Sequence, residues 1–408
     1  MTHVVTCFLR HRTAILLGRR SEAVGTYTGR WAGVSGYVEG DPADAEQDAR
    51  REIREETGRT DATLVRAGDP VEIRDGERTW TVHPFLFDVP SRTIAPNEEI
   101  ATHEWVSPPE MLERPTVPGL WDAYDAVAPT VETVAGDDIH GSAWVSVRAL
   151  EVLRDRAAVA DSADAVTDVA RDLREARPSM AALTNRVDRV MATGERTPRA
   201  VQRRAQAAAE AALDADDEAA ALAAERCGDA VATLSRSGTV LAALREAEPT
   251  VLIGESRPAC EGADVAATLA DEGLDVTLTT DAALAGEVAA RAPDAVLVGA
   301  DAVLADGSVV NKVGTRSLAL AAVREDVPVY VVAAADKVRP DETFHGETGD
   351  GAALYDGDAP VTVANPIFDR TPADLVAGVI TNRGMLGVEG VRAVAEEHRT
   401  HAAWDEDG

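Results

Sequence analysis

From about residue 248 onward, short apolar runs alternate with stretches that favour helix. The apolar runs are TVLIGE, DVTLTT, DAVLVGAD and PVYVVAAAD, and the stretches between them include ADVAATLADEG and GTRSLALAAVRE. Strands buried on both faces are apolar throughout, and their alternation with helices is typical of a parallel sheet with helical crossovers. This pattern therefore predicts an α/β fold for the last part of the chain.

The preceding region, from about residue 130 to 245, favours helix throughout, including LAAERCGDAVATL and the Ala-rich run AQAAAEAALDADDEAAALAAE. Apolar residues recur along the Ala-rich run, which favours a packed helix over a low-complexity linker. Near the start, VVTCFL and TAILLG within residues 3–17 predict paired strands. A chain of 408 residues is expected to form two or three domains, and we place the first boundary near residue 128.

The composition is strongly acidic, with 71 acids against 40 bases and a formal net charge of −31. Only two of the bases are lysines, Lys312 and Lys337. Self-repulsion of this size is tolerable where salt shortens the Debye length to about 3 Å at 1 M. We therefore expect a halophilic, cytoplasmic protein that does not bind nucleic acid directly. No membrane is expected as a partner, because no apolar run reaches about 18 residues.

A charged run, DARREIREETG, extends from Asp48 to Gly58. Its spacing places the carboxylates of Glu52, Glu55 and Glu56 on one face of a helix, where they repel one another. A hard divalent cation, Mg²⁺ or Mn²⁺, relieves that repulsion by binding carboxylate oxygens. The alternative is a solvated face paired with the interleaved arginines. The Gly-rich stretch before the run and the glycine at its end favour the metal site.

The same run, with WAGVSGYVE, VHPFLF and HEWVSPPEM around it, resembles Nudix domains over about residues 1–128. The resemblance implies an α/β/α sandwich and Mg²⁺-dependent hydrolysis of a nucleoside diphosphate linked to another group. It implies that Glu55 and Glu56 bind the metal and that Glu52 is a metal ligand or a base. It also implies that Arg51 orients the carboxylates and that Gly36 opens the preceding loop.

The loop before the run departs from the family pattern. The loop glutamate of the family falls on Pro42 when counted from Gly36 and on Ala43 when counted from Arg51. The nearby acids that could substitute are Glu39, Asp41 and Asp44.

Several further side chains lie next to the run or on a later strand. They are expected to pack rather than to stack a base: Arg30, Trp31, Tyr37, Trp80 and His83.

A second group of polar residues follows successive apolar runs in the last part of the chain. Arg257 follows TVLI, Asp301 follows AVLV, and Asn311 and Lys312 precede a helix that starts at Gly314-Thr315. Ligands bind at the carboxyl ends of strands in open α/β sheets, and helix starts present N–H groups to anions. We expect a phosphate site with Asp301 at its edge. The alternative is that each of these residues belongs to an ordinary turn. That explanation would be adequate for one such group, but three groups in this order favour a phosphate site.

These motifs resemble the alpha/beta/delta-subunit family of translation initiation factor 2B, over about residues 132–392. That family includes ribose-1,5-bisphosphate isomerase and methylthioribose-1-phosphate isomerase. The resemblance implies a helical subdomain followed by a Rossmann-like domain, a homodimer formed through the latter, and a sugar-phosphate or nucleotide ligand. The matching segments are DDIHGSAWVSVRALEVL, ARPSMAALTNRVDRV, which contributes Arg177 to ligand binding, CGDAVATLSRSGTVLAAL and NPIFDRTPADLVAGVIT.

The isomerases of this family use a cysteine in a Thr-His-Cys-Asn loop, paired with an aspartate. Ser235 stands in the position of the cysteine, and a hydroxyl is a far weaker acid than a thiol of pKa about 8.5. Asp301 matches the aspartate, while His140 stands where the isomerases have arginine. Ser235 and Ser237 resemble the non-catalytic subunits, so the resemblance implies ligand binding more than isomerisation.

The predicted domains are a Nudix domain at 1–128, a helical part at 129–245, a Rossmann-like part at 246–395 and an acidic tail at 396–408. The leading hypothesis is a Mg²⁺-dependent Nudix hydrolase of a nucleotide-type small molecule, fused to a domain that binds a sugar phosphate or nucleotide. One alternative is a bifunctional enzyme that also isomerises an aldose phosphate of the ribose-1,5-bisphosphate type. The other is a non-catalytic regulatory or initiation-factor-2B-like protein.

Overall fold

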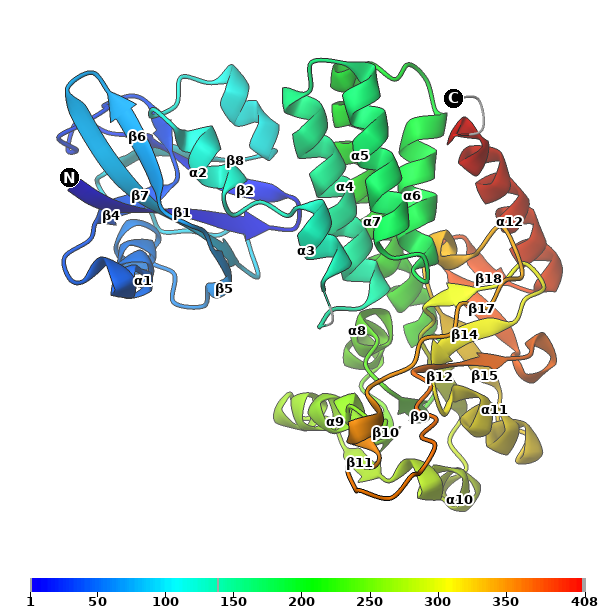
Figure 1. Cartoon of the computed structure of the whole chain (residues 1–408). Helices are drawn as coiled ribbons and strands as arrows, with labels where there is room; N and C mark the ends of the chain where they lie inside the picture. The colour runs from blue at the N-terminus through cyan, green and yellow to red at the C-terminus, as the bar shows by residue number, and fades with distance from the viewer. Residues whose placement is uncertain (1, 138, 406–408) are drawn as a thin grey trace. The chain divides into compact units, whose positions relative to one another are not determined.

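The computed structural model describes residues 2–137 and 139–405 and divides the chain into two compact units (Figure 1). The first unit is Met1–Thr130 with Arg154–Val159, and the second is Val131–Leu153 with Ala160–Gly408. No helix in the described ranges is long and apolar enough to cross a membrane.

The first unit is built on a mixed sheet. Its central strand β1 (Thr2–His11) runs parallel to β7 (Arg78–Asp88) and antiparallel to β2 (Ala14–Arg20), as the paired apolar runs predicted. The other strands pair antiparallel with these three: β3 (Trp31–Ala32), β4 (Val34–Tyr37), β5 (Thr63–Ala67), β6 (Val71–Asp75) and β8 (Ile100–Val106).

Helices cover both faces of this sheet. Alternate residues of β1 enter two apolar clusters, because successive strand side chains point to opposite faces. One cluster holds Ala45, Ala49 and Ile53 of α1 (Ala45–Thr57), and the other holds the buried residues of α2 (Leu120–Asp125). The expected α/β/α sandwich is confirmed. Two short 3₁₀ helices complete the unit: η1 (Pro42–Asp44) and η2 (Pro108–Glu113).

The second unit begins with a helical layer. The longest helix is α7, which buries one face made almost entirely of alanine, so the expected packed helix is confirmed. The helices are α3 (Val131–Ala135), α4 (Ser142–Val159), of which residues 142–153 belong to this unit, α5 (Ala163–Ala176), α6 (Ala181–Ala192) and α7 (Pro198–Ala224).

The helix expected over LAAERCGDAVATL, residues 222–234, is wrong beyond Ala224. Helix α7 ends at Ala224, and Ala230–Leu234 form strand β9. This strand lies in the middle of a sheet, between β10 (Thr250–Gly254) and β12 (Ala295–Val298), where pairing on both edges and burial outweigh the helix propensity of alanine.

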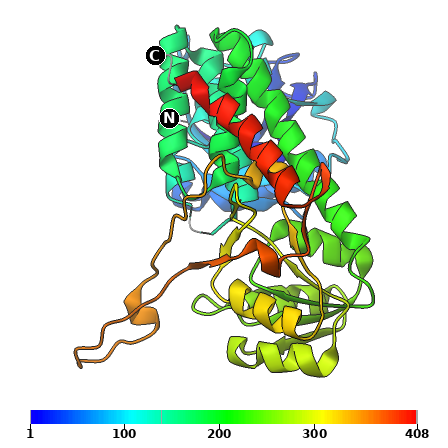
Figure 2. The ribbon, with the colours of Figure 1, turned by 90° about the vertical axis from the view of Figure 1, so that its right-hand side faces the viewer.

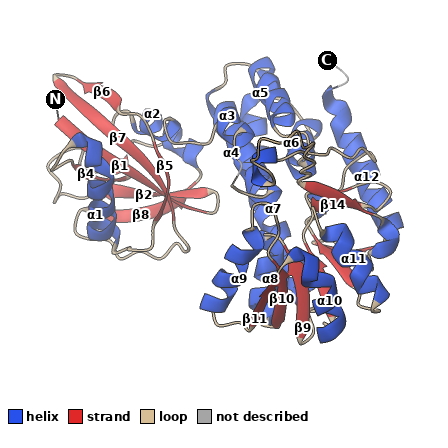
Figure 3. Cartoon of the chain, turned by 60° about the horizontal axis from the view of Figure 1, so that its bottom comes forward, coloured by secondary structure: helices blue, strands red, loops and turns tan. Residues whose placement is uncertain are grey.

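That sheet has the order β11-β10-β9-β12-β15-β17-β18 and is parallel except for its last pair, which confirms the Rossmann-like expectation. Helices α7, α8 and α9 pack on one face, and α10, α11 and α12 on the other (Figure 3). The remaining bounds are β11 (Val276–Thr279), β15 (Val329–Val332), β17 (Gly378–Thr381), β18 (Gly384–Leu386), α8 (Gly238–Ala247), α9 (Glu261–Asp271), α10 (Asp281–Arg291), α11 (Thr315–Arg324) and α12 (Val388–Ala402).

A small antiparallel sheet lies beyond the end of β12, with the order β13-β14-β16. Between η3 (Ala335–Lys337) and β16, residues 340–367 form a long excursion, drawn in orange in Figure 2, that carries η4 (Gly351–Ala353). The other bounds are β13 (Ala302–Val303), β14 (Val309–Lys312), β16 (Phe368–Thr371), η5 (Ala373–Leu375) and η6 (Ala403–Asp405).

Candidate functional site

Of the three α1 glutamates expected to bind metal, two lie against the sheet of the first unit. Glu56 is buried and accepts a 2.8 Å hydrogen bond from the backbone N–H of Ser35 on β4. Burial raises the pKa of Glu56 to about 8; the bond from Ser35 opposes this, and the carboxylates of Glu99 and Glu52 add to it. Burial also raises the pKa of Glu52. Glu55 is exposed on the same helix.

The guanidinium of Arg51 holds several groups around these glutamates in place. Its guanidinium donates to Glu52 at 2.8 Å, to the carbonyl of Tyr37 at 3.1 Å and to Asp48. It also forms an ion pair with Glu39 at 3.2 Å. Glu39, one of the acids suggested for the loop position, therefore contacts Arg51. A second suggested acid, Asp41, caps the 3₁₀ helix η1 by accepting from the N–H of Ala43.

Gly36 contributes by having no side chain. A β-carbon at this position would lie 2.0 Å from both Cδ and Oε1 of Glu52, far inside contact distance. The absence of that carbon lets the Glu52 carboxyl group approach the backbone of β4. The glycine that the resemblance picked out thus makes room for a candidate metal ligand.

The site includes one acid that the sequence reasoning missed. Glu99 lies in the loop before β8, and its charge raises the pKa of both Glu52 and Glu56. The loop is fixed to the end of α1 by backbone bonds from Asn97 to the Glu56 carbonyl at 3.1 Å and from Ala95 to the Thr57 carbonyl at 2.8 Å. The only sequence signal for Glu99 is that it belongs to an acidic pair, and such a pair is uninformative in a chain this acidic.

These side chains fit a divalent cation, although their arrangement is not that of a formed metal site. Among the described residues, no group of three or more His, Cys, Asp or Glu is arranged to hold a metal ion. Yet Glu56 is a buried acid whose ionisation is opposed by the charges of Glu99 and Glu52, and a cation would stabilise the charged form of all three. Oxygen donors alone suit Mg²⁺ or Mn²⁺.

A cavity opens beside the carboxylates, lined by residues of β1, β4, β6 and β7 and by the start of α2. Tyr37 and Trp80, which were expected to pack, both line it, and Tyr37 is 56% exposed. The packing expected for Tyr37 is therefore wrong. His83 is buried, in agreement with the packing expected for it, and its Nε2 lies 2.9 Å from Nδ1 of His3.

In the second unit, Asp301 follows β12 at the carboxyl edge of the parallel sheet. Burial raises the pKa of Asp301, while Lys337, Lys312 and Arg177 act in the opposite direction. Lys337 is buried, and its ammonium donates to the carbonyl of Ala300 at 2.6 Å. Both lysines of the chain thus act electrostatically on one carboxyl group. Lys337 was not predicted as a site residue; its rarity in this sequence was the available signal.

The other expected phosphate contacts already have partners within the chain. Lys312 forms an ion pair with Glu261 at 2.6 Å. The side chain of Arg257 donates to the carbonyl of Ala353 in the excursion at 3.3 Å, and its backbone N–H donates to Asp281 at 2.7 Å. A phosphate would have to displace these side-chain contacts of Lys312 and Arg257.

Two N–H groups at the start of α11, where Gly314-Thr315 was expected to present N–H groups to an external anion, already have a partner within the chain. The Asp369 carboxylate accepts from the N–H of Gly314 at 2.8 Å and of Arg316 at 3.2 Å. Asp369 comes from β16, which pairs with β14 directly before this helix. The anion that the helix start favours is therefore supplied by the chain itself.

The remaining expected ligand-binding residues take part in local bonds. The N–H of Ser235 donates to the Ser256 hydroxyl at 2.6 Å, and Ser237 caps α8 by accepting from Val240. Asn311 donates to the Thr315 hydroxyl at 3.0 Å, and a β-carbon on Gly299 would lie 2.6 Å from the Ser237 hydroxyl. Arg177 donates to the carbonyls of Ala135 and Asp137 at 3.0 and 2.9 Å.

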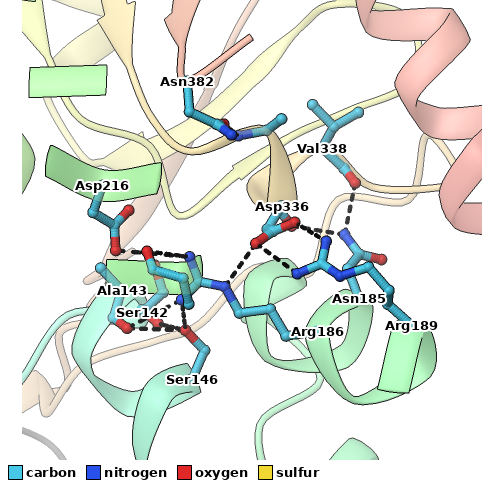
Figure 4. Close-up of polar contacts among 12 residues, drawn as sticks. Ser142, Ala143, Ser146, Asn185, Arg186, Arg189, Asp216, Asp336, Val338 and Asn382 are labelled. Carbon is cyan, nitrogen blue, oxygen red and sulfur yellow. Dashed lines mark hydrogen bonds and ion pairs between the residues drawn. The ribbon is translucent and has the colours of Figure 1, made fainter. Parts of the chain in front are cut away.

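A buried ionic network fixes the element that carries Lys337. Asp336 of η3 accepts from Arg186 at 2.8 Å and from Arg189 at 2.5 Å, both on α6 (Figure 4). Burial opposes the ionisation of Asp336, but the two arginine charges outweigh it and hold its pKa below the usual range. The network thus joins the helical layer to the strand end beside Asp301.

The sequence of residues 138–387 matches the profile of the Initiation factor 2 subunit family. The chain belongs to this family. Residues 1–127 match the NUDIX domain, so the two resemblances are confirmed. The part of the chain that matches the family contains Asp301 and the serines of the β9–α8 loop.

Named relatives agree with this membership. The chain is 32% identical over 310 residues to ribose 1,5-bisphosphate isomerase of Haloferax volcanii, covering 67% of this chain and 94% of the relative. It is 33% identical over 250 residues to methylthioribose-1-phosphate isomerase of Gemmatimonas aurantiaca, covering 54% and 72%. The solved structure of translation initiation factor eIF-2B from Pyrococcus horikoshii is similar with a TM-score of 0.56 and 29% identity, covering 63% of this chain and 94% of that one.

Proposed function

We propose that the first unit is a divalent-metal-dependent hydrolase that cleaves a nucleoside diphosphate linked to another group. The observation that carries this proposal is the buried carboxyl group of Glu56 beside Glu52 and Glu99. A fold gains no stability from gathering three acids without a cation, so the arrangement favours a metal. Bound Mg²⁺ would supply neutralisation of phosphate charge. Glu52, Glu55, Glu56 and Glu99 would hold it, and Arg51 would orient Glu52.

The test is hydrolysis of a panel of nucleoside diphosphate compounds by the purified chain in high salt with Mg²⁺. Products are separated by anion-exchange chromatography. The double variant Glu55→Gln, Glu56→Gln is the control, and we expect it to lose at least about a hundredfold in rate. No hydrolysis by the wild type, or equal hydrolysis by the control, would remove the proposal.

For the second unit we propose binding of a sugar phosphate or nucleotide at the carboxyl edge of the parallel sheet. Asp301, Ser235, Ser237 and Asn311 lie at the strand ends or the starts of the helices that follow, where such folds bind ligands. Arg177, Arg257 and Lys312 would contact the phosphate after exchanging their present partners. We also propose a cytoplasmic homodimer formed through this unit, which light scattering in high salt would test.

A second candidate function for this unit is isomerisation of an aldose phosphate. Two observations favour it: relatives that align with this unit are named isomerases, and burial raises the pKa of Asp301 towards the range useful for proton transfer. The test is conversion of ribose 1,5-bisphosphate by the wild type and by Asp301→Asn. Conversion that survives Asp301→Asn would contradict this candidate.

A further inference from the structure

We propose that Lys337 is a positioning residue for Asp301: its buried ammonium group keeps the Asp301 carboxyl group in the charged form, which can accept a proton from a ligand. The proposal rests on the ligand binding proposed above for the second unit, and it deepens that function by making Asp301 a base. Lys337 is the buried one of the chain's two lysines, and neither function proposed for this unit uses it.

The ammonium group of Lys337 is bonded to the residue that directly precedes Asp301. Lys337 is 5% exposed, and its Nζ donates to the carbonyl of Ala300 at 2.6 Å. The backbone of Asp301 is fixed in turn, because its N–H donates to the carbonyl of Val310 on β14 at 2.9 Å. The ammonium of one residue and the backbone of the other are therefore held at the same strand end.

The turn that carries Lys337, residues 335–338, is fixed by polar side chains from several other elements. Side chains of α6 (Figure 4), of α12 and of the turn between β17 and β18 bond to its backbone, and two arginines of α6 pair with Asp336. Because the turn cannot move without breaking these bonds, the Lys337 ammonium stays at the end of β12. The backbone bonds run from Asn185 to the carbonyls of Asp336 and Val338 at 2.8 Å each, from His398 Nδ1 to the Val338 carbonyl at 2.7 Å, and from the N–H of Ala335 to Asn382 at 3.0 Å.

Both charged groups have hydrogen-bonding capacity that the chain does not use. Of the three N–H groups of the Lys337 ammonium, one meets the Ala300 carbonyl, and no other described residue accepts from it. Within the same described ranges, no residue donates a hydrogen bond to the Asp301 carboxyl group. A buried polar group without a partner costs stability. Unused donors and acceptors at one strand end therefore favour a bound ligand there over a purely structural role for the lysine.

The charges around Asp301 act in the direction that the proposal requires. Burial raises the pKa of Asp301, and the positive charge of Lys337 is the largest influence that lowers it. Lys312 and Arg177 act in the same direction as Lys337, whereas Glu347 of the excursion acts against them. Lys337 and Asp301 make no direct bond, so the effect is one of charge, which is strong in a low-dielectric interior. Without Lys337, the balance moves towards the protonated carboxyl group.

The dependence is mutual. Burial lowers the pKa of Lys337, and the largest influence that raises it is the charge of Asp301, followed by Asp216 of α7. Arg186 of α6 acts in the same direction as burial. Each of the two groups therefore keeps its charge largely because the other is charged.

The choice of lysine at this position is specific in a chain that otherwise uses arginine. Only two of its 40 basic residues are lysines. A guanidinium presents five N–H donors in a planar fork, whereas an ammonium is a compact charge that can be buried against a single carbonyl such as that of Ala300. A lysine therefore suits a position where one buried charge must act on one carboxyl group.

The experiment follows the two lysines of the full chain by NMR, in high salt, as the pH is raised. Lysine isotope-labelled at Cε gives two signals, and Lys312→Arg assigns them. Because the coupling of two sites is reciprocal, the effect of Lys337 on Asp301 equals that of Asp301 on Lys337. We expect Asp301→Asn to lower the titration midpoint of Lys337 by about one to three pH units. Asp306→Asn, which removes the partner of Arg370, is the matched control and should leave the midpoint unchanged. Asp301→Ser serves if Asp301→Asn does not fold.

The outcomes separate this inference from the functions proposed for the second unit. Equal midpoints for Lys337 in the wild type and in Asp301→Asn overturn it, whether or not the chain converts any substrate. A lowered midpoint without conversion of ribose 1,5-bisphosphate supports the positioning role and removes only the isomerase candidate. Where the wild type converts this substrate, Lys337→Met should move the acid limb of kcat/KM to higher pH, and Lys337→Arg should move it back. A merely structural lysine would leave that limb in place, and this result would overturn the inference.

Discussion

The carboxyl group of Glu52 lies directly against the backbone of Gly36. A β-carbon at residue 36 would be 2.0 Å from its Cδ and Oε1. Glu52 is held in this position from the other side by Arg51, at 2.8 Å. The strand and the helix therefore approach each other only because residue 36 is glycine, and the first prediction follows from this contact.

Gly36→Ala should displace the Glu52 carboxylate and weaken metal binding while leaving the fold intact. No positive φ is required at this position, so the cost comes from the clash alone. We expect Mg²⁺ or Mn²⁺ affinity, measured by titration calorimetry, to fall by about tenfold or more. The control is Gly40→Ala, because a β-carbon there has nothing within 4 Å. Equal affinities for the two variants would contradict the prediction.

Much of the first unit could be predicted from the sequence because its signals are local. The spacing of Glu52, Glu55 and Glu56 places them on one helix face, and Gly58 ends the helix with φ 72°. Glu99 could not be found this way. It reaches the site through a loop whose backbone bonds to the end of α1, a contact between segments some forty residues apart, which no local pattern encodes.

Glu56→Gln should change how the stability of the metal-free first unit depends on pH. Folding raises the pKa of Glu56 to about 8, so between about pH 4.5 and 8 the folded chain binds more protons than the unfolded chain. The wild type therefore loses stability as the pH rises through this window, by a few kcal/mol, and Glu56→Gln does not share that loss.

Tryptophan fluorescence during urea unfolding in EDTA measures this difference, because Trp31, Trp80, Trp105 and Trp121 report on the first unit. Stabilities are compared at pH 5 and pH 8. Glu55→Gln, an exposed neighbour, is the control and should keep the slope of the wild type. A wild type as stable at pH 8 as at pH 5 would show that Glu56 ionises without cost.

Ser235→Cys should give the second unit aldose-phosphate isomerase activity, or raise any that the wild type has. A thiol has a pKa of about 8.5 and can exchange protons near neutral pH, whereas a serine hydroxyl cannot. Asp301, the expected partner, already lies at the strand end beside Lys337. Conversion of ribose 1,5-bisphosphate by Ser235→Cys, compared with Ser235→Cys, Asp301→Asn, measures the effect. Activity that persists in the double variant would contradict the pairing.

In the second unit the sequence predicted the sheet but not the partners of its polar residues. The apolar runs were enough for the parallel strands, since burial on both faces leaves a direct signal. The start of α11 was expected to bind an external anion. Asp369, more than fifty residues later, takes that place because β16 pairs with β14. Strand pairing over such a distance has no signature in a single sequence.

Asp336→Asn should destabilise the second unit more than a substitution that breaks a surface ion pair does. Asp336 pairs with Arg186, which is fully buried, and with Arg189. Removing one charge of a buried pair leaves the other unpaired and costs about 3–5 kcal/mol. Since the pKa of Asp336 is lowered on folding, its contribution is present above about pH 4 and is lost as the pH falls further. Scanning calorimetry at pH 7 measures the shift in the second unit's transition.

The control for this prediction is Glu287→Gln, which removes one partner of the exposed i,i+4 pair with Arg291. That change should cost no more than about 0.5 kcal/mol, because solvent screens the pair. The double variant Asp336→Asn, Arg186→Met removes both charges, and it should recover part of the loss by leaving no buried ion from this pair. If Asp336→Asn costs as little as Glu287→Gln, the network does not hold η3, and another contact must place Lys337 beside Asp301.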